Sequence, residues 1–215
     1  MVAVNIMAVT QLYETYVKTA CAAGVDAIIS GAGLPTELPK FAEGYDVALA
    51  PIVSSTKSAN VILKFWDKKY HRTADFLVIE GPLAGGHLGF SREQLEDIPG
   101  LDYDTEIRNI ITLKQAYEEK YQTAIPVFVA GGMFTAEDVK HVLELGADGI
   151  QAATRFVATE ECDASDAYKQ ATSMLPKKML SLSKARWECP AALSKMRLSS
   201  VCLQHRTKSP TASTV

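Results

Sequence analysis

The chain has 215 residues, enough for one large domain or two small ones. Hydrophobic residues make up 47% of it and charged residues 22%, which is ordinary for a soluble globular protein. The formal net charge of −3 gives no reason to expect a nucleic acid or an anionic membrane as a partner, and no apolar run approaches the roughly 20 residues of a spanning helix.

The first two thirds of the chain alternate between short apolar runs and longer segments with apolar residues at helical spacing. The apolar runs predict strands and the spaced segments predict helices. The predicted strands are 2–6, 26–30, 46–53, 75–79, 125–130 and 148–151. The predicted helices are 12–23, a short one ending at Phe41, 58–70, 105–121 and 135–145, with a long polar loop before 105–121.

Six β-then-α units in a row predict an α/β fold with a parallel sheet, right-handed crossovers and helices outside. Two architectures satisfy this pattern, an open doubly wound sheet and a closed TIM-type (β/α)8 barrel. The barrel needs eight units and about 250 residues, so six units leave two unaccounted for. Periodicity alone does not decide between the two architectures.

Three predicted strand ends are rich in glycine or small polar residues, and both architectures bind ligands at the carboxyl ends of strands. Their sequences are EGPLAGGHLG at 80–89, AGGM at 130–133 and QAATR at 151–155. The last two follow consecutive strands, so together they predict a phosphate cradle like that of strands seven and eight in a barrel. Taken singly, each turn is equally well explained as a tight connection between a strand and a helix.

His87 lies in a glycine-flanked loop just past a predicted strand end. A histidine in such a place is a candidate general base near neutral pH, although on its own it is also explained as an ordinary surface residue. The other three histidines fall in a polar loop, in a helix and in the C-terminal tail, where nothing indicates chemistry.

The segment DFLVIEGPLAGGHLGF (75–90) resembles the histidine loop of the nitronate monooxygenase (2-nitropropane dioxygenase) family, which is related to the FMN-dependent enoyl-acyl-carrier-protein reductases. The segment IPVFVAGGMFTAEDVKHVLELGADGIQAATRFVATEEC (125–162) is similar to the phosphate-binding pair of strands in that family. VNIM and DAIISGAGLP resemble its third and fourth strand ends. The resemblance covers about residues 1–171.

This resemblance implies an FMN enzyme that oxidises alkyl nitronates or nitroalkanes with dioxygen to a carbonyl compound and nitrite. His87 would face the substrate and take its proton or stabilise the nitronate. The residues implied to contact FMN are Asn5 and Gln151 at the flavin ring, and Gly131, Gly132, Ala153 and Thr154 at the phosphate. Ala153 stands where many relatives have glycine, and its N–H remains available.

The family's barrel begins before VNIM, so the resemblance also implies that residues 1–171 form an incomplete barrel without its first two βα units. Open sheet edges in such a barrel would favour instability or association into a homo-oligomer. After Ala171 the pattern breaks. One coding of the family peptide DVVIVKSPVGMPGRA, read one base later, gives residues 179–191 at every position, so we expect 172–215 to be a divergent tail that is out of frame or disordered. The alternative is a genuine, divergent helical tail. Sequencing the source DNA tests this.

Four scattered cysteines without CxxC spacing predict neither a zinc site nor disulfides, and they favour a reducing cytoplasm. The opening nine residues lack basic residues and are not expected to be a signal peptide. Three alternatives to a nitronate-oxidising enzyme stay open: an FMN- and NAD(P)H-dependent enoyl-acyl-carrier-protein reductase, a non-catalytic flavin-binding remnant, and another phosphate-binding barrel such as a sugar-phosphate isomerase.

Overall fold

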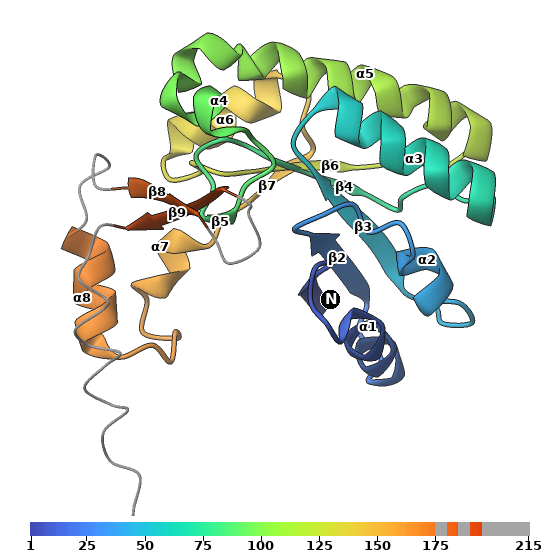
Figure 1. Cartoon of the computed structure of the whole chain (residues 1–215), viewed down its shortest axis with the longest axis horizontal. Coiled ribbons are helices and arrows are strands. Elements are labelled where there is room, and N and C mark those ends of the chain that lie inside the picture. Colours follow the sequence, from blue (N-terminus) through green and yellow to red (C-terminus); the bar gives the residue numbers. More distant parts are fainter. Residues whose placement is uncertain (175–179, 185–189, 195–215) are drawn as a thin grey trace, which may run out of the picture.

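The computed structural model describes residues 1–174, 180–184 and 190–194. Its main feature is a curved, six-stranded parallel sheet in the order β1-β2-β3-β4-β6-β7 (Figure 1). The strands are β1 (Ala3–Met7), β2 (Ala27–Gly31), β3 (Ala48–Val53), β4 (Leu77–Glu80), β6 (Val127–Ala130) and β7 (Gly149–Gln151). Because they follow one another in chain order, the sheet lacks the reversal of strand order that defines a doubly wound fold. The predicted parallel α/β arrangement is confirmed.

Five helices lie where the sequence predicts them, with small shifts at their ends: α1 (Tyr13–Ala22), α2 (Leu38–Phe41), α3 (Thr56–Tyr70), α5 (Tyr103–Tyr121) and α6 (Ala136–Glu144). Two further helices, α7 (Thr154–Val157) and α8 (Asp166–Met174), are not among the predicted ones. The long helices α3 and α5 lie side by side along the sheet (Figure 1). Among the helices of the described part, none is both long and apolar enough to cross a membrane.

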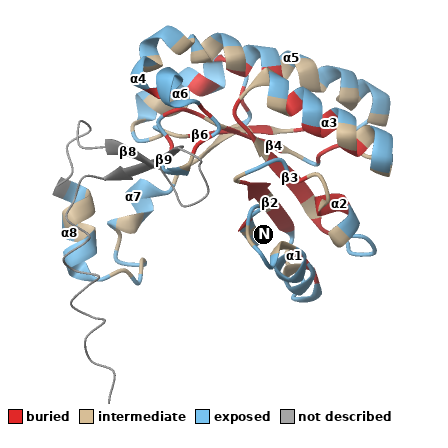
Figure 2. Ribbon diagram, viewed as in Figure 1, coloured by how far each residue is buried: buried red, intermediate tan, exposed pale blue. Residues whose placement is uncertain are grey.

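The main core lies between the sheet and these helices, where the buried residues of Figure 2 gather. Leu77 and Ile79 of β4 belong to it, together with Leu63 and Trp66 of α3. Since successive side chains of a strand point to opposite faces, the intervening Val78 and the last residue of β4 lie on the other, concave face. The helices therefore cover the convex face of the sheet. The last residue of β4 points to the concave face, which these helices do not cover.

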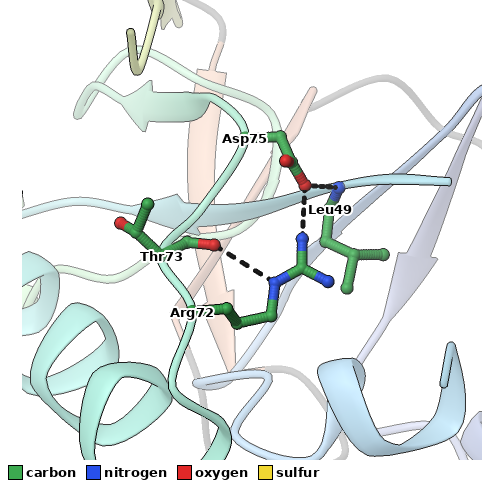
Figure 3. A network of polar contacts seen from close by, with 4 residues as sticks. All are labelled: Leu49, Arg72, Thr73 and Asp75. Atoms are coloured by element: carbon green, nitrogen blue, oxygen red, sulfur yellow. Dashed lines mark hydrogen bonds and ion pairs between the residues drawn. The ribbon is translucent and has the colours of Figure 1, made fainter. Parts of the chain in front are cut away.

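At the amino ends of the strands, Asp75 makes a two-point contact with the neighbouring strand (Figure 3). Its N–H donates to the carbonyl of Leu49 at 3.0 Å, and its carboxylate accepts from the Leu49 N–H at 2.7 Å. Arg72 donates to the same carboxylate at 2.6 Å and to the carbonyl of Thr73 at 3.2 Å. This contact, which we call an aspartate clasp, fixes the position of β4 relative to β3.

The same clasp recurs at two other strand pairs. Asp148, just before β7, donates to the Val127 carbonyl and accepts from the Val127 N–H, both at 2.8 Å. Asp26, just before β2, makes the equivalent pair of hydrogen bonds with Val2. An aspartate before an apolar run therefore sets strand register here at three places.

The predicted polar loop before α5 contains further structure. It holds a two-residue strand β5 (Gly86–His87), the helix α4 (Arg92–Glu96) and a 3₁₀ helix (Ile98–Leu101). Ser91 caps α4, since its side chain accepts from the Gln94 N–H and the Gln94 side chain accepts from the Ser91 N–H. These elements are too short for hydrophobic periodicity to reveal them.

Helix α8 continues past the predicted boundary at residue 171. Two further strands, β8 (Leu180–Lys184) and β9 (Pro190–Ser194), pair with each other antiparallel, and β9 also pairs with β5. The rest of the predicted out-of-frame tail, at 175–179, 185–189 and 195–215, lies outside the described residues. The origin of this tail stays a prediction.

Candidate active site

The carboxyl ends of β4, β6 and β7 bring the three glycine-rich segments side by side. Glu80 pairs with Ala130, and Ala130 pairs with Gln151, so these residues form one row across three neighbouring strands. Residues 81–89, here called the histidine loop, start directly after Glu80. The two turns that follow Ala130 and Gln151 are here called the cradle turns. The first consists of residues 131–133 and the second of residues 152–155. The sheet order thus joins segments far apart in the sequence.

The histidine loop packs closely against the first cradle turn. Gly131 and Gly132 have positive φ angles of 92° and 80°, which favour glycine. A Cβ atom at Gly131 would lie 2.9 Å from the backbone nitrogen of Ala84 and 3.0 Å from the carbonyl oxygen of Gly81. A Cβ atom at Gly132 would lie 3.0 Å from Leu83. Besides any approach to a phosphate, these glycines therefore let the histidine loop approach the strand end.

The cradle turns carry backbone N–H groups that are free to bind an anion. Within the described residues, the N–H groups of Gly131, Gly132 and Thr154 donate to no acceptor. Arg155 of the second turn contacts the residue that follows the first turn, because its Nη1 donates to the Phe134 carbonyl at 2.5 Å and its guanidinium lies 5.1 Å from the Phe134 ring centre. Unpaired backbone amides at the ends of two neighbouring strands are a donor set that suits a phosphate group.

His87 lies in β5, beyond the end of β4, and its side chain is half-buried. Its Nε2 atom is shielded from solvent and has no hydrogen-bond partner in the described part of the chain. Buried polar atoms are normally paired, so an unpaired ring nitrogen in this position marks His87 as a candidate contact for a bound molecule.

Glu80 is a site residue that the sequence did not single out. It ends β4 on the concave face, and burial raises the pKa of its carboxyl group to about 7. Its side chain makes no hydrogen bond or ion pair with any described residue. The only feature of the sequence that could have indicated Glu80 is that one acidic residue ends an otherwise apolar strand.

The remaining predicted residues are not all brought together. Gln151 is half-buried, and Ala153 and Thr154 are exposed beside the first cradle turn. Asn5 lies exposed on the concave side of β1, and β2 and β3 separate it from β4. Its predicted contact with the flavin ring stays a prediction, as do the roles of the other site residues.

The model of the nitronate monooxygenase family matches residues 1–185. The chain belongs to the nitronate monooxygenase family. The resemblance based on the histidine loop and the cradle turns is thereby confirmed.

Individual relatives of this nitronate monooxygenase family member match over part of their length. The nitronate monooxygenase of Pseudomonas aeruginosa is 33% identical over 98 residues, which are 46% of this chain and 25% of that protein. A probable nitronate monooxygenase of Staphylococcus saprophyticus is 32% identical over 99 residues, 46% of this chain and 26% of that protein. The chain thus matches about a quarter of the length of these curated relatives.

Two solved structures share the fold. FabK from Thermotoga maritima superposes with a TM-score of 0.70 at 22% identity, over 95% of this chain and 58% of that one. Nitroalkane oxidase from Streptomyces ansochromogenes gives a TM-score of 0.60 at 22% identity, over 84% and 48%. At these identities the likeness establishes the fold alone.

Proposed function

We propose that this chain binds FMN and oxidises alkyl nitronates or nitroalkanes with dioxygen, giving a carbonyl compound and nitrite. The observation that carries the proposal is the junction between the histidine loop and the first cradle turn. There an imidazole nitrogen lies on a loop that packs against two glycines, and within the described part of the chain neither this nitrogen nor the glycine N–H groups have a hydrogen-bond partner. Membership of the nitronate monooxygenase family supports the class of reaction.

We propose that the cradle turns hold the FMN phosphate. The N–H groups of Gly131, Gly132 and Ala153 and the N–H and hydroxyl of Thr154 would supply the hydrogen bonds. When bound, FMN supplies the redox chemistry with dioxygen, and the protein binds and orients the reactants. Gln151, on the concave face beside the first cradle turn, would line the flavin.

His87 is proposed to handle the substrate proton. As a neutral imidazole, its Nε2 accepts the proton from the carbon that bears the nitro group. As an imidazolium, it donates a hydrogen bond to the nitronate oxygens and so stabilises the anion. The Nε2 atom is suited to both tasks, because it has no partner to give up among the described residues.

The sheet is proposed to be six strands of a TIM-type (β/α)8 barrel that is incomplete in this chain. The parallel strands in chain order, with their helices on one side, support this architecture. Within the described strands, β1 pairs only with β2 and β7 pairs only with β6, which leaves both edges available for further strands.

The test combines a spectrum with a nitrite assay. Purified protein is incubated with FMN and desalted, and flavin bands that stay with the protein indicate binding. Nitrite release from a nitroalkane or its nitronate is then measured in air. The variant His87→Ala is expected to keep FMN and to lose nitrite release by about 100-fold or more. His71→Ala, at the exposed end of α3, is the matched control and should change neither.

The outcomes separate the alternatives. Bound FMN that oxidises NADH rapidly but releases no nitrite would favour the enoyl-acyl-carrier-protein reductase, which shares the histidine loop. Bound FMN without either activity would favour a non-catalytic remnant. Protein that stays colourless after FMN is added contradicts the proposed function.

A further inference from the structure

Tyr103, the first residue of α5, contacts residues at the start of the histidine loop and just beyond its end. Its hydroxyl donates to the carbonyl of Glu80 at 2.7 Å, where the loop begins. Its ring lies against Gly81, since a Cβ atom there would be 3.2 Å from Tyr103 Cε1. Just beyond the far end of the loop, its ring meets the Phe90 ring edge to face, with centres 5.6 Å apart. One side chain therefore spans the whole loop.

The histidine loop also has a hydrophobic cluster of its own. The buried residues of this satellite cluster are Ala84, Leu88, Phe90 and Leu95. Leu101 and Tyr103 pack against it, and Tyr103 also packs against the main core. Tyr103 thus connects the small cluster, which includes Leu88 next to His87, to the main core of the sheet and helices.

Two hydrogen bonds fix the point where the loop leaves the sheet. The Gly81 N–H donates to the Ala130 carbonyl at 2.8 Å, and the Tyr103 hydroxyl binds the preceding carbonyl. Burial raises the pKa of Tyr103 above its usual value, and the carboxylates of Glu80 and Glu106 add to this. The hydroxyl consequently remains protonated, and a donor, throughout the neutral range.

We propose that Tyr103 is the positioning residue for His87. By contacting Glu80 and Phe90, which flank the histidine loop, it sets where the imidazole lies relative to the cradle turns. The catalytic consequence rests on the proposed function, in which His87 acts on the substrate. The structural consequence is a defined position for the His87 ring, and it does not depend on the proposed function.

The test compares Tyr103→Phe with Tyr117→Phe in the full chain. Tyr103→Phe keeps the ring and removes the hydrogen bond to Glu80. Tyr117 lies on the same helix, is half-buried against the main core and is far along α5 from the loop, so it is the matched control. The ring signals of His87 are followed by NMR, with those of His71 as an internal reference. FMN affinity, kcat and KM are measured alongside.

Tyr103→Phe is expected to shift or broaden the His87 signals while those of His71 stay in place. It should lower kcat by about ten-fold, because small displacements of a catalytic group are costly. KM and FMN affinity should stay within about two-fold, as expected when only the reacting step is affected. Tyr117→Phe should change none of these. If Tyr103→Phe does not fold, Phe90→Leu removes the ring contact instead and should move the His87 signals in the same way.

Unmoved His87 signals in a folded variant would overturn the proposal, whatever happens to kcat. Moved signals with an unchanged kcat would overturn the catalytic part. If the wild-type chain binds no FMN or releases no nitrite, the proposed function fails together with that catalytic part. The NMR comparison then still decides whether Tyr103 positions the ring.

Discussion

At Gly131 the backbone conformation and the packing both require glycine. Its φ angle is 92°, and the nearest atoms to a Cβ are backbone atoms of the histidine loop, which cannot rotate away. Gly85, within that loop, has neither constraint, because a Cβ there would meet nothing within 4 Å. The two positions therefore separate a glycine needed for structure from one that tolerates a methyl group.

Gly131→Ala is expected to lower the free energy of unfolding by about 2–4 kcal/mol, combining left-handed strain with overpacking. Gly85→Ala should change it by less than about 0.5 kcal/mol. Urea denaturation of the two variants beside the wild type measures both values. Equal effects would mean that the histidine loop does not rest on the first cradle turn as the structure has it.

Glu80 is expected to make stability depend on pH. Burial raises its carboxyl pKa from the ordinary value of 4.5 to about 7 in the folded chain, so between these values the folded state binds more protons than the unfolded state. The contribution is fully present below pH 4.5 and is lost as the pH rises through 7. Glu80→Gln has no such loss.

The variant Glu80→Gln should therefore exceed the wild type in stability at pH 8 by up to about 3 kcal/mol, and by much less at pH 5. Urea denaturation at the two pH values measures the difference. A gain of the same size at both pH values would indicate that the substitution acts through packing and not through the carboxyl charge.

Among the elements, the aspartate clasps make a prediction about strand register. Asp148→Ala leaves the N–H of fully buried Val127 without its acceptor, which is expected to cost about 1–3 kcal/mol of unfolding free energy. Asp148→Asn keeps an acceptor oxygen and should recover part of this. Asp46→Ala is the control, since Asp46 precedes β3 but its side chain contacts no described partner.

Thermal or urea unfolding of the three variants decides the matter. A cost for Asp46→Ala as large as that for Asp148→Ala would show that loss of surface charge, and not the clasp, explains the effect.

The order and type of the main elements could be predicted because each strand is an apolar run and each long helix has a regular apolar face. Helix α3, for example, buries Ala59, Ile62, Leu63 and Trp66 at helical spacing. Helix α4 escaped prediction, because five residues are too few for a periodic pattern.

The segments of the candidate site could be predicted from the local sequence, but the contacts between them could not. Glycines and a histidine at strand ends mark the segments, and parallel strands bring their ends to one edge. The contact between Gly131 and Ala84, or between Tyr103 and Glu80, joins residues with no pattern in common. Such contacts depend on how loops pack in three dimensions, which no spacing along the chain encodes.

For the whole molecule, the position of the cradle turns within the sheet is decisive. They follow β6 and β7, and the histidine loop follows β4, whereas β1 lies at the opposite edge. The phosphate would therefore bind at the end of the sheet formed by β4, β6 and β7, remote from the exposed Met7 of β1. We expect the chain to bind the phosphate end of FMN even with β1 at an open edge.

FMN at 100 times its Kd should then raise the free energy of unfolding by about 2.7 kcal/mol, because only the folded chain has the cradle turns. Riboflavin, which has the same ring but no phosphate, should stabilise the chain far less at that concentration. Thr154→Ala should bring the FMN effect closer to that of riboflavin. Melting curves with each ligand measure this without any assay of activity. Equal stabilisation by FMN and riboflavin would place the binding energy in the ring contacts and contradict a phosphate site at Gly131, Gly132 and Thr154.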